Sequence, residues 1–262
     1  MPLTPKSSAA LLVGATAVVG IAACLAPRVA QPLSYHQFAD HRSWLGIANF
    51  GDVASNLPFA VAGIWGIWVL WRGSVDFVDV RERWPYGILF AGLILTALGS
   101  GYYHLAPDNE RLVWDRLPMT LGFMSLVAAI IMERISLKAG LVLLPVLLVV
   151  GIASVVQWHW SEVRGAGDLR FYAAVQVYAV VVILLALEMA PRYTRTYDLA
   201  IVGGFYVLAK ILETWDGSVF SLGHLVSGHT LKHLAASGAG FWIVYGLTKR
   251  KRLSHNAQVL AA

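Results

Sequence analysis

The sequence has few charged residues and almost no cysteine. Asp, Glu, Lys and Arg make up 13% of the 262 residues, whereas a soluble globular domain carries about 25%. This shortage of charge, together with a hydrophobic fraction of 58%, excludes an ordinary soluble domain. The single cysteine, Cys24, excludes an internal disulfide and says nothing about the redox compartment. The chain also lacks a Cys-x-x-Cys motif, a nucleophile elbow and a glycine-rich phosphate-binding loop.

Long apolar windows take up most of the chain instead. Eight of them are long enough to cross a hydrocarbon core of about 30 Å. They cover residues 9–26, 53–71, 85–104, 112–132, 138–157, 171–189, 197–214 and 224–247. We therefore predict an all-α polytopic membrane protein without a separate soluble domain. The first window is either a retained span or a cleaved signal peptide. Because the apolar core of a signal peptide has only about 7–15 residues, a retained span is favoured.

The net charge of +5 comes from basic residues that fall in alternate loops. They are Lys6, Arg72, Arg81, Arg83, Arg134, Lys138, Arg192, Arg195 and the cluster at 249–252. Because cytoplasmic loops of membrane proteins are enriched in Lys and Arg, this pattern predicts that both chain termini are cytoplasmic. The C-terminal cluster then anchors the topology near anionic headgroups. The distribution argues against a nucleic-acid partner.

Five polar side chains interrupt the apolar windows. Ser100 and His104 are four residues apart, and so are His229 and His233, which puts each pair on one helix face. Asp115 lies near the start of the fourth window. The predicted topology brings all five to the outer half of the bundle, where three histidines would suit a catalytic zinc site. The alternatives are histidines that only pack between helices and histidines that bind a haem.

Three further ionisable residues lie near the end of the seventh window. Glu213 and Asp216 would either bind an amine or a second cation, or be solvated acids at a helix end. Lys210 is expected to extend its amine toward the membrane surface, without a chemical role.

The order Ser-x-x-x-His, Asp, His-x-x-x-His resembles the CREST superfamily of membrane hydrolases, which includes the alkaline ceramidases (phytoceramidases) and the adiponectin-type receptors. The resemblance covers residues 35–247, and segments 35–42 and 49–59 are most similar to bacterial members of the alkaline ceramidase family. It implies a seven-helix bundle at residues 31–248, an extra N-terminal transmembrane helix at 1–30 and a basic cytoplasmic tail at 249–262. It also implies a bacterial inner membrane. Together with the topology predicted from the loop charges, this puts the site toward the periplasm and the C-terminus in the cytoplasm.

The resemblance assigns roles to the five polar residues. It implies that His104, His229 and His233 bind zinc. Asp115 would be either a general base or a partner that fixes a histidine tautomer. Ser100 would either donate a hydrogen bond to the substrate carbonyl oxygen or bond back to its own helix.

A second cation is the other expectation that comes from the family. Eukaryotic alkaline ceramidases have an acidic calcium site before the first core helix, and here only Asp40, Asn49 and Asp52 remain as oxygen ligands. Calcium takes six to eight oxygens. The alternative role for Asn49, Asp52, Ser55 and Asn56 is capping and interhelical hydrogen bonding.

The sequence therefore predicts a zinc-dependent lipid amidohydrolase. It would cleave the amide of a ceramide-like lipid into a fatty acid and a long-chain amine. The alternatives are a membrane receptor or scaffold with a structural zinc, and a proton or cation transporter. A transporter would need polar residues along a path through both leaflets, whereas here they concentrate in one half. The membrane and a lipid substrate are the predicted partners, with no protein partner indicated.

Overall fold

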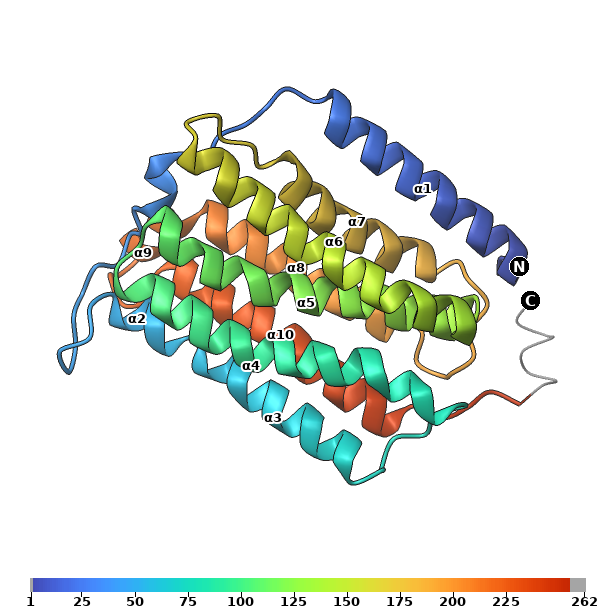
Figure 1. Ribbon diagram of the computed structural model, residues 1–262. Helices are drawn as coiled ribbons and strands as arrows, with labels where there is room; N and C mark the ends of the chain where they lie inside the picture. The colour runs from blue at the N-terminus through green and yellow to red at the C-terminus, as the bar shows by residue number, and fades with distance from the viewer. Residues whose placement is uncertain (1, 255–262) are drawn as a thin grey trace.

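The computed structural model describes residues 2–254 and shows an all-α protein (Figure 1). Within that range, extended pairing is limited to three isolated bridges. The predicted all-α class is therefore confirmed. The last part of the predicted basic tail, residues 255–262, lies outside the described residues.

Each predicted window contains a helix, although some bounds differ. The helices are α1 (Pro5–Leu25), α2 (Phe50–Ala54), α3 (Leu57–Trp71), α4 (Arg83–Leu105), α5 (Asn109–Arg134), α6 (Leu137–Val163), α7 (Arg170–Ala186), α8 (Asp198–Thr214), α9 (Asp216–Ser221) and α10 (Gly228–Lys249), with 3-10 turns at Leu33–His36 and Val80–Glu82. The second window is divided between α2 and α3, just before Pro58 in the first turn of α3. The last helix begins at Gly228 rather than near 224, because the Ser227 hydroxyl caps it by accepting a hydrogen bond from the Thr230 amide.

Five helical segments are long and apolar enough to cross a membrane. They are Pro5–Leu25, Phe50–Trp71, Val80–Leu105, Asn109–Arg134 and Leu137–Val163. Helix α7 is apolar but shorter. These segments support a membrane protein, while the eight spans and the seven-plus-one arrangement stay predictions.

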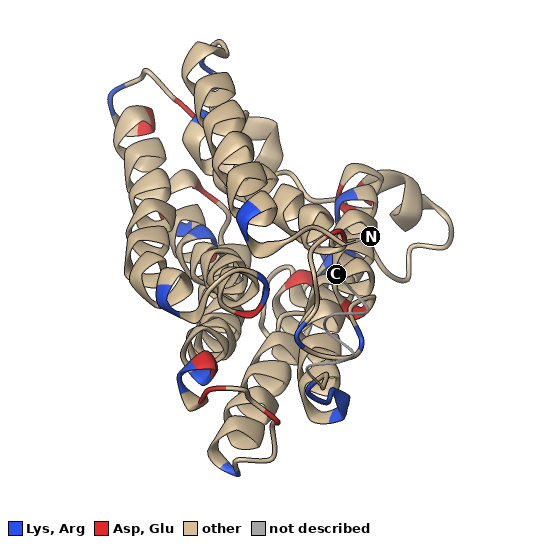
Figure 2. Cartoon of the chain, turned by 90° about the vertical axis from the view of Figure 1, so that its right-hand side faces the viewer, with Lys and Arg blue, Asp and Glu red and all other residues tan. Residues whose placement is uncertain are grey.

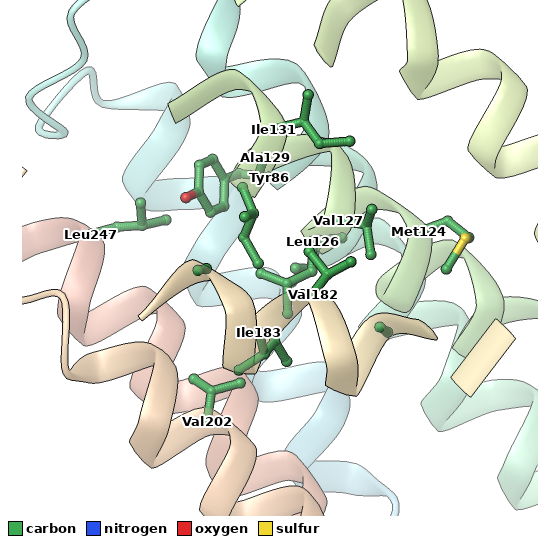
Figure 3. Close-up of a cluster of buried hydrophobic side chains, with 14 of the residues drawn as sticks. Tyr86, Met124, Leu126, Val127, Ala129, Ile131, Val182, Ile183, Val202 and Leu247 are labelled. Atoms are coloured by element: carbon green, nitrogen blue, oxygen red, sulfur yellow. The ribbon is translucent and has the colours of Figure 1, made fainter. Parts of the chain in front are cut away.

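Helix α5 forms the centre of the bundle. Its most apolar window is 72% buried inside the protein, compared with 11% for α1. The α5 residues from 124 to 132 are all buried, and Figure 3 shows several of them packed against side chains of α4, α7, α8 and α10. Because lipid tails are as apolar as these side chains, close contact rather than expulsion of water stabilises such packing.

Helices α4 and α5 are in close contact at Gly99. A Cβ atom at this position would lie 1.9 Å from the Trp114 carbonyl oxygen, so only glycine fits. The close approach brings the Ser100 hydroxyl to the Asp115 carboxylate across the interface. A glycine contact therefore positions two of the predicted site residues.

Helix α1 lies at the edge of the bundle along α7 (Figure 1). Its polar contact in the middle of the helix is between the Thr16 and Tyr178 hydroxyls, 2.9 Å apart. The residues that surround the histidines come from other elements, so α1 takes no part in building the site.

The two ends of the bundle differ in their chemistry. The start of α1 and the end of α10 meet the α7–α8 connection at one end, through bridges from Leu3 to Met189 and from Tyr193 to Arg252. Figure 2 views this end, where charged residues gather. At the same end, Arg250 forms an ion pair of 2.7 Å with Glu133 in the last turn of α5. The opposite end, called here the histidine end, contains the end of α4 and the start of α10.

Candidate metal centre

The three predicted histidine ligands lie together at the histidine end. His104 lies in the last turn of α4, and His229 and His233 lie in the first two turns of α10. One ring nitrogen from each lies within 4.8 Å of the other two. All three rings are buried, and the Nε2 atoms of His104 and His229 are 3.3 Å apart. The sequence spacing correctly predicted this cluster, which could hold a metal ion.

Ser55 fixes the orientation of the His233 ring. The Ser55 Oγ lies 2.8 Å from His233 Nδ1 and donates its own proton to the Asp52 carbonyl oxygen at 3.1 Å. It therefore accepts a hydrogen bond from Nδ1–H, which leaves Nε2 with a lone pair for a metal. Such a partner for the second ring nitrogen is typical of metal-binding histidines.

The donor set fits a zinc ion. His104 Nδ1 is buried without a hydrogen-bond partner, and its Nε2 faces another imidazole rather than a carboxylate. Buried polar atoms normally have hydrogen-bond partners. The imidazole nitrogens here face one another without a carboxylate between them, and this arrangement favours a bound cation as the missing partner. Three histidine ligands are a set found at catalytic zinc sites.

Aromatic and backbone contacts hold the rings in place. The Phe38 ring lies 4.7 Å from the His104 ring and 4.3 Å from the His229 ring, measured between centroids. Asn49 Nδ2 donates to the His104 carbonyl oxygen at 2.8 Å, and Asp216 Oδ1 accepts from the His229 amide at 2.8 Å. The interhelical role predicted as the alternative for Asn49 and Ser55 is confirmed. Asp216 also supports the start of α10, so it is not a freely solvated acid.

The predicted second-cation residues are engaged with other groups. Both Asp40 oxygens pair with Arg42, at 2.8 Å and 2.7 Å, and these hydrogen bonds lower the pKa of the Asp40 carboxyl. Asp52 Oδ1 accepts from the Thr230 hydroxyl at 2.7 Å, whereas its Oδ2 has no partner. With Asn49 bonded to the His104 backbone, a calcium ion here would have to displace these contacts, and the structure does not assemble the three residues as its ligands.

A cavity of about 340 Å³ connects His233 with Ser100 and Asp115. From Lys232 at the histidine end, its lining continues along α10 to Ile243, which corresponds to about 16 Å of helix. Most of the remaining lining is apolar and includes Leu89, Leu93, Phe123, Leu126 and Ala236. The cavity thus joins the polar groups of the site to an apolar interior.

A charged network that the sequence patterns did not predict lies beside the histidines. Lys232, between the two histidines of α10, forms a 2.7 Å ion pair with Glu213, and its Nζ lies 3.4 Å from His229 Nε2. Glu213 also pairs with Lys210 and accepts a 3.3 Å hydrogen bond from the Tyr35 hydroxyl. The Lys210 side chain is half-exposed and pairs with Glu213 one turn later on α8, so the expectation that it extends toward the membrane surface stays a prediction. The position of Lys232 inside His-x-x-x-His was the signal that could have found this network.

No known protein family model and no curated protein matches this chain. The function is therefore inferred from the site itself. The structure contains a membrane-type helical bundle and a buried histidine triad that could hold a metal ion.

Proposed function

We propose that the protein is a zinc-dependent membrane hydrolase that cleaves the amide bond of a ceramide-like N-acyl lipid into a fatty acid and a long-chain amine. The observation that carries the proposal is that His233, one member of the buried histidine triad, lines the same cavity as Asp115, Ser100 and an apolar interior. The resemblance to the alkaline ceramidase branch of the CREST hydrolases supports the same function. The proposed location is a bacterial inner membrane, as the resemblance implies, with the site toward the periplasm, as the positions of the basic loops favour.

His104, His229 and His233 would hold the zinc ion. When bound, zinc polarises a carbonyl oxygen and makes a water molecule acidic enough to be a nucleophile near neutral pH. Ser55 keeps His233 in the tautomer that presents Nε2. Phe38 covers the rings of His104 and His229 and limits the access of bulk water to them.

Asp115 is the proposed general base. Within residues 2–254, no Lys or Arg nitrogen lies within 4.0 Å of its carboxylate, so the oxygens are not committed to an ion pair. It accepts the proton of the attacking water and delivers it to the amide nitrogen, which leaves as an amine. The alternative role, fixing a histidine tautomer, is already performed for His233 by Ser55.

Ser100 is the proposed hydrogen-bond donor to the substrate carbonyl oxygen. It lies one turn before His104 on α4 and faces Asp115 in the cavity. A donor directed at the carbonyl stabilises the negative charge that develops there during attack. The apolar lining between Leu89 and Ile243 would accommodate the acyl chain. A site inside the bundle favours a substrate that arrives laterally from the bilayer.

The test is metal content and product formation on detergent-purified protein. The proposal expects about one zinc per chain and release of fatty acid from a long-chain ceramide, both lost in a His229→Ala/His233→Ala variant. Zinc without any amide hydrolysis would favour a receptor or scaffold with a structural metal. Protein purified without chelators that contains no metal would contradict the hydrolase.

A further inference from the structure

Arg116 on α5 is a buried cation without an acidic partner. Its side chain is among the most buried of the charged residues, at 5% exposure. Nη2 donates to the Gln31 side-chain oxygen at 2.6 Å, while Nη1 has no hydrogen-bond partner. Among residues 2–254, no carboxylate oxygen lies within 4.0 Å of the guanidinium. Buried arginines are almost always paired, so one polar partner is missing.

Three aromatic rings hold the guanidinium in place. Its central carbon lies 4.1 Å from the ring centre of Trp158, 4.6 Å from that of Tyr172 and 5.7 Å from that of Tyr35. Cation–π contacts of this kind offset part of the cost of burying the charge. The rings do not supply oxygen atoms in the plane of the guanidinium group, which are the acceptors that its N–H groups bind. The rings therefore orient Arg116 without satisfying Nη1.

Arg116 lines the same cavity as the proposed catalytic groups. It follows Asp115 directly in α5, and Tyr35 connects it to the charged network, because the Tyr35 ring lies over Arg116 and its hydroxyl donates to Glu213. The oxygen that Nη1 lacks could therefore come from a molecule bound in this cavity.

The charged residues that line the cavity indicate the sign of the charge on that molecule. Its charged lining residues are three cations, Arg116, Lys210 and Lys232, and two carboxylates, Asp115 and Glu213. Both lysines pair with Glu213. The lining therefore has one more positive than negative side chain, and among these residues Arg116 is the cation that lacks an acidic partner.

We propose that Arg116 binds an anionic oxygen group of the lipid, either a carboxylate or a phosphodiester, that carries one negative charge. The inference rests on the proposed function and narrows its substrate class. The preferred lipid is an N-acyl compound with an acidic polar part, such as an N-acyl amino acid or an N-acylated phospholipid, which is cleaved faster than a neutral ceramide. Arg116 is a substrate-binding residue in this proposal, and Trp158, Tyr172 and Gln31 position it.

Two matched pairs of substrates test the proposal. A long-chain N-acylglycine is compared with its uncharged primary amide, and an N-acylphosphatidylethanolamine with the neutral N-acylethanolamine. The wild-type protein should prefer the anionic member of at least one pair by about 10- to 100-fold in kcat/KM, the range expected for a buried charge-assisted hydrogen bond. The preferred pair identifies the source of the anion, carboxylate or phosphodiester.

Variants at Arg116 connect the preference to this side chain. Arg116→Gln should remove most of the preference, and Arg116→Lys, which keeps the charge but not the fork, should retain part of it. Because both members of a pair are measured on the same variant, any loss of folded protein cancels in their ratio. Neutral members cleaved as fast as anionic ones by the wild type would overturn the proposal, as would an unchanged ratio in Arg116→Gln.

A binding measurement separates this inference from the proposed function. A long-chain alkylthioacetic acid carries the carboxylate but has no amide to hydrolyse, and its primary amide is the uncharged control. Tighter binding of the acid, lost in Arg116→Gln, would support the anion site even if none of the four lipids were cleaved. Equal binding of the acid and its amide, with amide hydrolysis intact, would overturn the anion site and leave the hydrolase standing.

Discussion

The Ser55 hydroxyl lies 2.8 Å from Nδ1 of His233, across 178 residues of sequence. Ser55 lies where α2 ends and α3 has not yet begun, so a break in one helix supplies a hydrogen bond to a metal-ligand candidate on another. The contact selects the tautomer that presents His233 Nε2 to the cluster.

Removal of this contact should weaken metal binding without abolishing it. Ser55→Ala is expected to lower zinc affinity by about 10- to 100-fold, because the His233 ring loses the partner that fixes its tautomer. Competition with a chromophoric chelator measures the affinity. Ser237→Ala is the matched control, since Ser237 is a buried serine on α10, one turn after His233, whose hydroxyl donates to the Leu234 carbonyl oxygen of its own helix. Equal affinities in the two variants would contradict the role of Ser55.

The histidine ligands themselves should be indispensable for the metal. His229→Ala and His233→Ala should each reduce the zinc content measured by mass spectrometry, and amide hydrolysis should fall to background with it. His224→Ala is the control, because His224 is exposed in the loop before α10 and should leave the zinc content unchanged. Full zinc retention in both single variants would overturn the ligand assignment.

Asp115→Asn separates chemistry from metal binding. The substitution keeps the size of the side chain but removes the basic carboxylate, so zinc content should stay normal while kcat falls by about 100- to 10,000-fold. Single-turnover assays with a fluorescent N-acyl lipid measure the loss. A near-normal rate would show that another group accepts the proton and that Asp115 has a supporting role.

The close approach of α4 and α5 should be sensitive to one methyl group. Gly99→Ala is expected to destabilise the protein by about 1–3 kcal/mol, because the new Cβ would collide with the Trp114 carbonyl oxygen. Gly101→Ala on the same helix meets no atom within 4 Å and should be neutral or stabilising, since alanine favours the helix. Thermal unfolding in detergent compares the two. Equal midpoints would mean that α4 can shift without cost.

The membrane orientation can be tested with thiol labelling. In a Cys24→Ser background, Glu110→Cys at the histidine end should react with a membrane-impermeant reagent added to spheroplasts. Lys251→Cys, at the opposite end, should react only after the membrane is permeabilised. The reverse pattern would place the site on the cytoplasmic side.

Much of the site followed from local sequence spacing. A four-residue interval places two side chains on the same helix face whatever the surroundings, so the pairs Ser100–His104 and His229–His233 could be predicted without tertiary information. The N-cap of α5 is a local feature of the same kind, because the Asp108 side chain accepts from the amide of Arg111 three residues later. The contacts of Glu213 could not be predicted in the same way, because its partners Lys232 and Tyr35 lie on other segments of the chain.

The sequence by itself determined the helical class, the approximate apolar segments and the set of residues able to bind a metal. These properties depend on hydropathy and helical period, which act over one or two turns. Only the tertiary structure decided that Ser55 fixes His233, that Arg42 occupies the Asp40 carboxylate and that Arg116 faces the cavity without an acid. The physical reason is that hydrogen-bond and charge partners depend on distances between helices, and close contacts such as Gly99 against Trp114 set those distances.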